Sequence, residues 1–308
     1  MAVPSSGAIS LAGIRAELAT NTYNASATTA SSLEDCSDGT VATINTDNAA
    51  NDRPNGNTPH LMSEFYAYDH DLSSFSDDIS FDFDGANDYL SATGDLPAAN
   101  ALETTGSVSM WVKLDAMSSN GIMWQITAEE GTDNQLFILW QNAVGKIRGS
   151  VKLGGTANTV DSGSGLEGDD TWHHVVMTWF SGGKSAAGNI VRLYVDGSQT
   201  DTDAIGNTWN DGSPPAHFII GRNNIATNAY FNGHMNDIAI FSDVLSAGEV
   251  STIYNSGSPK DESSHSGLMA YYTMEAYSDG DTSLADDSSN SFALTINNST
   301  NIDSTDTP

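Results

Sequence analysis

The sequence is poor in cysteine and in basic residues. Cys36 is the sole cysteine among 308 residues, which excludes an internal disulfide framework. Ten Lys and Arg stand against 40 Asp and Glu, so the formal net charge is −30. Ten scattered cations cannot neutralise a phosphate track or an anionic membrane surface. We therefore expect no nucleic-acid partner.

Long apolar runs and a leader sequence are also missing. No stretch approaches the roughly 20 apolar residues of a membrane span, so we expect no membrane insertion. The start, Met1–Gly7, has neither the basic region nor the apolar region of a signal peptide. The acidic, Lys-poor composition is nevertheless typical of extracellular proteins. These two features together predict a protein made in a host cytoplasm without a signal peptide and released by lysis, that is, a virion protein.

Residues 1–75 differ in composition from residues 76–308. Ser10 is placed to cap a short helix, and an aromatic cluster ends near Tyr68. So few apolar residues predict a core too small for independent folding. We expect a small, mostly irregular and helical module that docks on a partner protein. The residues expected to contact that partner are Leu11, Ile14, Leu18, Phe65 and Tyr66.

Beyond residue 75 the apolar residues recur with a period of two. Ser107–Leu114 alternates apolar and polar side chains, as a half-buried strand does. Asp196-Gly197 follows another such run and is a strong signal for a tight hairpin turn. Many short strands separated by Gly, Asn and Asp predict an all-β fold, a two-sheet antiparallel sandwich.

One helix is predicted within this β region. Ser246 and Glu249 form a capping box, and Leu245 and Val250 are placed as a hydrophobic staple. Gly257 is a natural helix stop. We expect a short helix that packs on the edge of the sandwich and carries no chemistry.

Several motifs of this region resemble the laminin-G-like (concanavalin A-like) jelly-roll family. The resemblance covers residues 76–308 and implies two curved antiparallel sheets. It also implies, in many members, a bound calcium, and binding of carbohydrate or protein without catalysis. The motifs that carry it are Phe83–Ser91, Ser109–Val112, Trp172–Val176, Leu193–Gly197, Ile219–Gly221 and Phe231–Phe241.

The resemblance also implies candidate calcium ligands, because clustered Asp and Asn oxygens suit this cation. The run Gly267–Met274 and the loop after it usually open such domains but here close one, which predicts a permuted arrangement. Ser289 stands where the family's loop has a glycine. Solvated turn residues are the alternative interpretation. The candidate ligands are Asp237, Asp286, Asp287, Asn290 and Asp84.

Catalytic patterns are missing. The glucanases of this fold carry Glu-x-Asp-x-x-Glu on one strand, and Glu129–Asp133 has the wrong spacing for that pair of carboxylates. His173 and His174 alternate along a strand and point to opposite faces, so they cannot bind one metal side by side. We expect no catalytic residues and no enzyme.

Sugar binding needs aromatic rings on an exposed face or rim, with polar side chains beside them. Trp209 and Tyr230 lie in predicted loops and are the candidates for such platforms. They can equally face a neighbouring subunit. The remaining tryptophans lie in predicted strands, where burial in the core is expected: Trp111, Trp124, Trp140, Trp172 and Trp179.

The segments Ser6–Arg15 and Pro59–Tyr66 are similar to segments of tailed-bacteriophage structural and fibre proteins. This likeness favours a virion structural protein, either a tail fibre (adhesin) or a capsid decoration. In that case residues 1–75 dock on other virion proteins and the jelly roll faces outward. We expect a homo-oligomer that contacts cell-surface polysaccharide. Two alternatives stay open: a secreted bacterial lectin or adhesin, and a non-catalytic binding module of a glycoside hydrolase.

Overall fold

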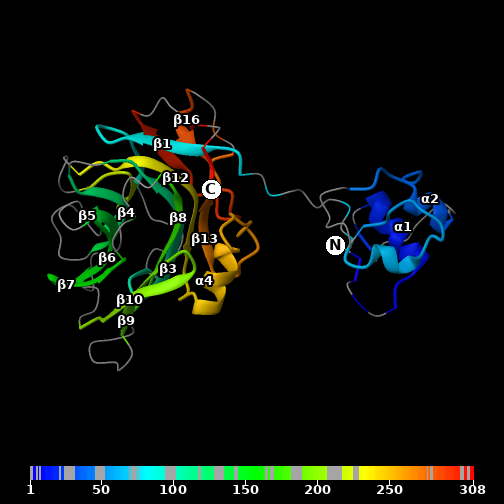
Figure 1. The fold of residues 1–308 in the computed structure, drawn as a ribbon, viewed down its shortest axis with the longest axis horizontal. Helices are drawn as coiled ribbons and strands as arrows, with labels where there is room; N and C mark the ends of the chain where they lie inside the picture. Colours follow the sequence, from blue (N-terminus) through cyan, green and yellow to red (C-terminus); the bar gives the residue numbers. More distant parts are fainter. Residues whose placement is uncertain are drawn as a thin grey trace. The chain divides into compact units, whose positions relative to one another are not determined.

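The computed structural model divides the chain into two compact units, residues 1–75 and residues 76–308, which we call the N-terminal unit and the body (Figure 1). In the described part of the chain, no helix is long and apolar enough to cross a membrane. The structure describes all residues except 1–2, 5, 7, 21, 24–31, 46–52, 69, 71–74, 76, 94–101, 117–118, 128–134, 142–144, 164–165, 167–169, 182–188, 207–216, 225–228, 276, 278–279, 299–301 and 304–305.

Short helices build the N-terminal unit: α1 (Leu11–Thr20), α2 (Leu33–Ser37) and the 3₁₀ helix η1 (Met62–Phe65). The Ser10 hydroxyl accepts the Gly13 amide at 3.0 Å, so Ser10 caps α1 as expected. Ser32 caps α2 in the same way, through a capping box with Asp35.

The N-terminal unit has an apolar core of its own, so the expectation of too small a core is wrong. Its buried residues come from segments far apart in the sequence, and none of those segments is strongly amphipathic. Partly buried residues such as Tyr23 and Met62 pack around them. The buried core consists of Val3, Ile14, Leu18, Cys36, Phe65 and Tyr68.

This core changes the interpretation of the docking residues. Ile14, Leu18 and Phe65 are buried within the unit, and their side chains are therefore not available to a partner. Leu11 and Tyr66 are partly exposed, and docking through them stays a prediction. Leu61, which precedes η1, has half of its surface exposed. It was not among the expected docking residues, although it begins the apolar run that continues to Tyr68.

The body is the predicted antiparallel sandwich of two sheets, which confirms the all-β fold. Sheet A has the order β10 (Ser198–Ala204), β9 (Ile190–Val195), β8 (Trp172–Phe180), β3 (Thr105–Leu114), β12 (Asn232–Phe241), β1 (Ser80–Asp84) and β16 (Ile302–Asp303), and β13 (Leu268–Tyr272) also pairs with β12. Sheet B has the order β14 (Ser283–Leu284), β15 (Leu294–Asn297), β2 (Tyr89–Thr93), β11 (His217–Ile220), β4 (Gly121–Thr127), β5 (Gln135–Gln141), β6 (Lys146–Leu153) and β7 (Thr156–Asp161).

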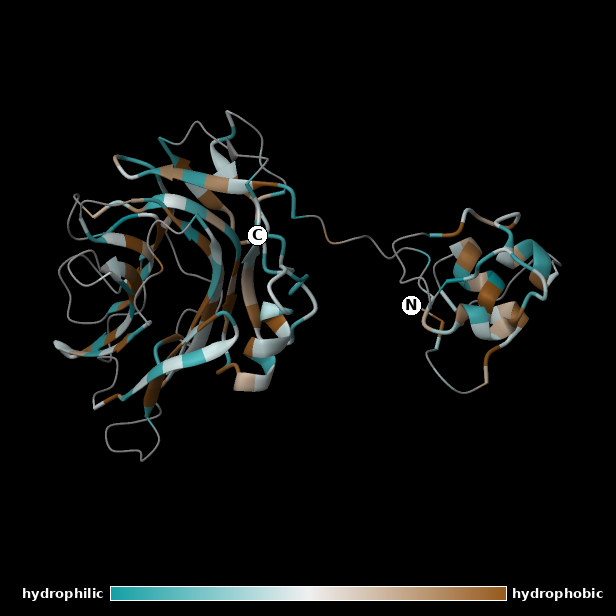
Figure 2. Ribbon diagram, viewed as in Figure 1, coloured by the Kyte–Doolittle hydropathy of each residue, from teal (hydrophilic) through white to brown (hydrophobic). Residues whose placement is uncertain are grey.

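The main core lies between the two sheets, where brown apolar segments alternate with teal polar ones along the strands in Figure 2. Trp124, Trp140 and Trp179 are fully buried there, as expected of strand tryptophans. Trp111 is also buried, but on the outer face of sheet A, whereas Trp172 is partly exposed. The hairpin turn at Asp196-Gly197 forms between β9 and β10, with positive φ at both residues.

The helix α4 (Ala247–Tyr254) covers part of the outer face of sheet A. The Ser246–Glu249 capping box is present, and Leu245 and Val250 are buried. Tyr254 stacks on Trp111 of β3 and on His174 of β8, at centroid distances of 5.9 and 6.0 Å. Asn255, not Gly257, takes the first left-handed conformation after the helix, so α4 ends two residues earlier than the glycine predicts.

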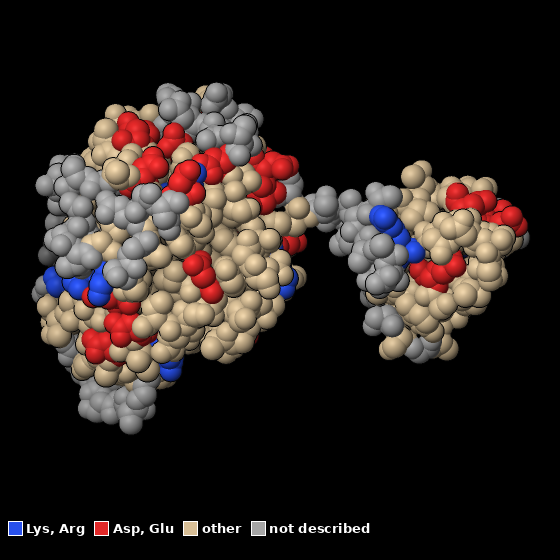
Figure 3. Space-filling view, viewed as in Figure 1, with Lys and Arg blue, Asp and Glu red and all other residues tan. Residues whose placement is uncertain are grey.

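The C-terminal segment closes both sheets. β16 pairs with β1 at one edge of sheet A, and β14 forms an edge of sheet B through β15. The carboxylate of Asp306 accepts hydrogen bonds from Lys113 Nζ at 2.7 Å and from Trp172 Nε1 at 2.8 Å. Residues near the end of the sequence are thus fixed to β3 and β8. Acidic side chains form several groups on the face shown in Figure 3, with few basic ones beside them.

Candidate functional sites

Asp237 lies at a bulge in β12, next to the segment of β12 that pairs with β13. The register between β12 and β3 shifts between Asn236 and Ala239, and Asp237 has a left-handed φ of 52°. The Asn236 side chain stabilises this conformation by accepting the Asp237 amide at 2.7 Å. The Asp237 carboxyl is buried and accepts a short hydrogen bond from the Tyr271 hydroxyl.

Two further carboxyls lie near Asp237. Burial raises the pKa of Asp77 to about 7, against the effect of the hydrogen bond from Asn236 and with a contribution from Glu275. Burial also raises the pKa of Glu262 to about 7. The pKa of Asp237 is raised well above its ordinary value by desolvation and by the charges of Asp77 and Glu262. We call Asp77, Asp237 and Glu262 the buried carboxyl cluster.

This cluster is poorly solvated and incompletely hydrogen-bonded. Asp77 Oδ2 and Glu262 Oε1 are buried without a hydrogen-bond partner in the described structure. Glu262 also lines a hollow of about 450 Å³ beside α4, together with Glu249, Lys260 and His265. Protonation removes the repulsion between the like charges of these carboxylates without a bound cation. At low pH the cluster therefore consists of neutral carboxylic acids, and at high pH it consists of carboxylate anions that repel one another.

The loop after β13 uses its polar side chains to hold the main chain. Both carboxylate oxygens of Asp286 accept two hydrogen bonds each: from the Tyr271 and Ser288 amides, and from the Ser288 hydroxyl and the Phe292 amide. Asp287 accepts the amide and hydroxyl of Thr273, at 3.0 and 2.8 Å. The Asn290 amide group donates to two carbonyls of β13.

The residues that the resemblance implies as calcium ligands do not fit a shared calcium site. The two carboxylate oxygens of Asp286 already accept four hydrogen bonds, and the amide nitrogen of Asn290 holds the main chain of β13. Asp237 contacts the hydroxyl end of Tyr271, whereas Asp286 contacts the main chain of that residue. Asp84 accepts the amides of its own turn. Among the described residues, no three or more His, Cys, Asp and Glu side chains form a metal-binding group.

A second candidate site lies on the outer face of sheet B, around the connection from β11 to β12. This connection closes where the Phe231 amide donates to the Gly221 carbonyl at 2.8 Å. Arg222 and Tyr230 are therefore the first and last residues of the connection, and their main chains lie at its base. The segment is held on the sheet because Asn224 hydrogen-bonds with Gln125 and Thr127 of β4.

Tyr89 of β2 supplies the floor of this second site. Leu90 and Ala92 of the same strand point into the core, so Tyr89 and Ser91 point outward. The guanidinium carbon of Arg222 lies 3.9 Å from the centroid of the Tyr89 ring. On β15, Asn297 is opposite Tyr89 and donates to the Ser91 hydroxyl at 3.0 Å. We call Tyr89, Ser91, Arg222, Tyr230 and Asn297 the sheet B site.

Only one of the two predicted sugar-binding aromatic residues lies in the described part of the structure. Tyr230 is partly exposed and belongs to the sheet B site, but its role in sugar binding stays a prediction. Trp209 lies outside the described residues. Sequence reasoning missed Tyr89 and Arg222 because the pairing of β2 with β11 is not visible from either segment. The rarity of arginine in an acidic chain was the available signal for Arg222.

The histidine pair of β8 points to opposite faces, as the strand period predicts. His173 hydrogen-bonds with the Asp196 carboxylate through Nδ1 at 2.9 Å. His174 lies beneath α4, and burial lowers its pKa to about 4. Its Nε2 contacts the Ser109 hydroxyl at 2.7 Å. Both rings therefore serve packing and hydrogen bonding within the body.

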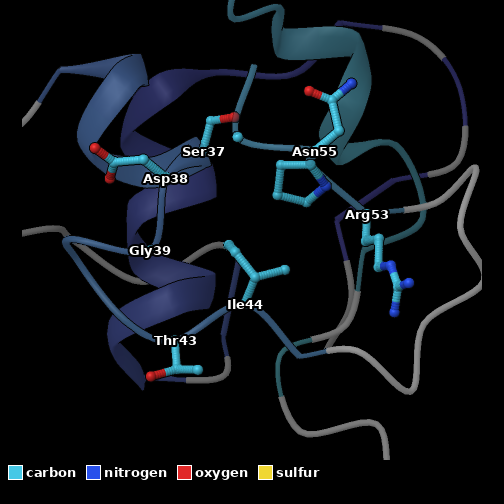
Figure 4. A pocket seen from close by; sticks show the side chains of 9 residues that line it. Ser37, Asp38, Gly39, Thr43, Ile44, Arg53 and Asn55 are labelled. Carbon is cyan, nitrogen blue, oxygen red and sulfur yellow. The ribbon is translucent and has the colours of Figure 1, made fainter.

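The N-terminal unit has an open hollow of about 700 Å³ (Figure 4). Its wall is mostly main chain and short side chains from the end of α2 and from residues 53–56. The charged residues Asp38 and Arg53 and the apolar Ile44 border it. The hollow is a surface feature of one unit, close in sequence to the exposed Leu61.

Comparison with known proteins places the body in a family. Residues 84–251, more than half of the chain, match the Laminin_G_3 model, described as the concanavalin A-like lectin/glucanases superfamily. No curated protein sequence matches the chain.

Solved structures share the fold at low identity. A putative carbohydrate binding protein from Bacteroides ovatus ATCC 8483 aligns with 17% identity and a TM-score of 0.55, over 75% of this chain and 60% of that chain. A native heptameric SAP-like pentraxin from Limulus polyphemus aligns with 16% identity and a TM-score of 0.46, over 58% and 82%. The IT-sialidase CBM40 of Ruminococcus gnavus, bound to α2,3 sialyllactose, aligns with 14% identity and a TM-score of 0.45, over 57% and 96%. The family match and the two-sheet fold together show that this chain belongs to the concanavalin A-like lectin/glucanases superfamily.

Proposed function

We propose that the body is a non-catalytic glycan-binding module that holds sugars at the sheet B site. The observation that carries the proposal is the grouping of Tyr89, Arg222, Ser91 and Asn297 on the outer face of sheet B, with the partly exposed Tyr230 at the base of the connection that carries Arg222. Aromatic rings bind the apolar face of a sugar, and amide and hydroxyl groups bind its hydroxyls. The carbohydrate-binding protein that shares the fold supports this direction.

The buried carboxyl cluster does not supply a competing catalytic site. Asp237 is 3% exposed and Glu262 is 6% exposed, so a polysaccharide cannot reach a bond-cleaving pair there. The Tyr271 hydroxyl already occupies one oxygen of Asp237. A non-catalytic module is therefore the better proposal.

The direct test is binding of the full chain to an array of neutral and acidic oligosaccharides. Tyr230→Ala should weaken binding by up to about tenfold, because an aromatic stacking contact contributes about 0.5–1.5 kcal/mol. Tyr66→Ala is the matched control, since it removes a partly exposed tyrosine from the N-terminal unit. Absence of binding by the wild-type chain to every glycan would refute the proposal.

The N-terminal unit supports a second part of the proposal, attachment of the chain to a larger assembly. It is a separate compact unit with an open hollow, and it exposes Leu61 beside η1. The similarity of Ser6–Arg15 and Pro59–Tyr66 to tailed-phage proteins favours a virion as that assembly. The matches described above are not virion proteins, so we rank glycan binding first.

Attachment is tested by removing residues 1–70 and measuring incorporation into particles. The shortened chain should keep the cooperative unfolding of the body and lose incorporation. Incorporation at normal copy number would exclude docking through this unit.

A further inference from the structure

Arg222 is held in one orientation by its contact with Tyr89. A guanidinium 3.9 Å from a ring centroid is attracted by the π face, and this geometry covers one face of the planar group. Its N–H donors lie in the plane of the guanidinium and point away from the ring. The contact therefore orients the donors without using them.

Two other cations of the body, Lys113 and Arg148, have carboxylate partners. Lys113 contacts Asp170 and Asp306 at 2.6 and 2.7 Å. Arg148 forms two parallel hydrogen bonds with Asp161, at 2.6 and 2.9 Å. Arg222 has no ion pair within the described structure, and its Nε is buried without a hydrogen-bond acceptor. What distinguishes Arg222 is the combination of the ring contact with a buried N–H donor that has no acceptor.

The acidic residues closest in the fold do not neutralise Arg222. A side chain at Gly221, which precedes Arg222, would collide with the Phe83 ring and approach the Asp88 carbonyl, so the turn of Asp84 and Asp88 lies close to the start of the connection. The Asp88 carboxylate accepts the Asp84 amide at 3.1 Å, and Asp84 accepts the Ala86 and Asn87 amides. These carboxylates organise their own turn, so the positive charge of Arg222 stays available to a ligand.

We propose that the sheet B site selects sugars that carry a carboxylate, which Arg222 binds. This inference rests on the proposed function, because it names the class of sugar for the same site. A guanidinium and a carboxylate form charge-assisted, often bidentate hydrogen bonds that fix both partners. Tyr230 at the base of the same connection supplies the ring, and Asn297 and Ser91 supply hydroxyl-binding groups.

The net charge of the chain acts against this selectivity only over long distances. A charge of −30 repels a polyanion in dilute buffer, but screening limits the repulsion to about 8 Å at physiological ionic strength. The contact between Arg222 and a carboxylate is short and survives that screening. Binding of an acidic sugar should therefore be measured near 0.15 M salt, a physiological value.

The test compares carboxylated sugars with neutral counterparts on the full chain. Sialyllactose is paired with lactose, and oligogalacturonate is paired with its methyl ester; the two pairs distinguish a sialic acid from a uronic acid. The wild-type chain should bind one acidic member about tenfold or more tightly than its neutral counterpart. Arg222→Gln should remove that difference and leave binding of the neutral sugar unchanged.

The control variant is Lys152→Gln, which removes a cation from β6 of the same sheet, at a distance of four strands from β2. It should keep the preference. Equal binding of acidic and neutral sugars by the wild-type chain, or a preference that persists in Arg222→Gln, would overturn the inference while glycan binding stands. Equal binding of dextran sulfate and the carboxylated sugars would overturn the carboxylate selectivity. Failure to bind any sugar would instead refute the proposed function.

Discussion

The N-terminal unit and the body assemble their apolar cores from different sequence patterns. In the body, strands such as β3 place every second side chain in the core, so the pattern of one segment predicts its own buried face. In the N-terminal unit, the core joins single residues such as Val3, Cys36 and Tyr68 from separate segments. A core can therefore be complete even where no segment has a clear period. Low apolar content is a poor guide to whether such a segment folds.

The largest effect on stability is expected when a core side chain is removed from each unit. Trp124→Ala should lower the stability of the body by about 3–5 kcal/mol, because it leaves a large cavity between the sheets. Ile14→Ala should lower the stability of the N-terminal unit by about 2–5 kcal/mol. Calorimetry of the full chain should show each variant shifting a different transition.

Thr295→Ala is the control for both, because it changes an exposed side chain of β15. Should both core variants shift one common transition by the same amount, the two units would not be independent and the comparison would fail.

A smaller effect is expected from the buried carboxyl cluster of the body. The native-state pKa values of Asp77 and Glu262 lie near 7, above those of the unfolded chain. Between about pH 4 and pH 7 the native body therefore binds more protons than the unfolded chain, and these two groups make stability fall as pH rises. The double variant Asp77→Asn and Glu262→Gln should be more stable than the wild type by about 1–3 kcal/mol at pH 8, allowing for the partial exposure of Asp77.

The measurement is urea unfolding of wild type and variant at pH 4.5 and pH 8. The advantage of the variant should shrink at the lower pH, where the native wild-type carboxyls are protonated. Asp261→Asn, at an exposed neighbouring position, should not reproduce it. An advantage of equal size at both pH values would show that the effect is not due to titration.

The smallest expected effect concerns helix capping, which both units use in the same form. Ser246→Ala in α4 and Ser32→Ala in α2 each remove a hydroxyl that accepts an amide of the first turn. Each should cost about 1 kcal/mol, seen only in the transition of its own unit. Replacement of each serine by threonine should retain most of the stability that alanine loses. If the alanine and threonine variants are destabilised equally, the effect is due to side-chain packing and not to the capping hydrogen bond.

Local features of the fold could be predicted from the sequence, whereas long-range pairings could not. The alternation of Ser107–Leu114, the Asp196-Gly197 turn and the Ser246–Glu249 box each depend on neighbouring residues, and the structure has all three. The change in composition near residue 75 coincides with the boundary between the units.

The candidate sites depend on residues that only the folded chain brings together. Asp77 contacts Asn236 across 159 positions of sequence, and Arg222, in the connection after β11, contacts Tyr89 of β2. Asp286 was a candidate metal ligand because of its residue type, but its hydrogen bonds with Tyr271 and Phe292 could not be known without the pairing of β13 with β12. Residue type predicts what a side chain can bind, and tertiary structure decides whether its atoms are free to do so.

The attachment of β16 and Asp306 has a consequence for synthesis on the ribosome. Residues 1–75 hold a complete core and can fold as soon as they emerge. β1 emerges next, but its partner β16 and the anchor of Lys113 follow more than 200 residues later. At roughly 5–20 residues per second, the edge of sheet A at β1 stays open for about 10–50 seconds. During that interval the nascent body depends on chaperones, or on its dense negative charge, to keep neighbouring chains from pairing with the open edge.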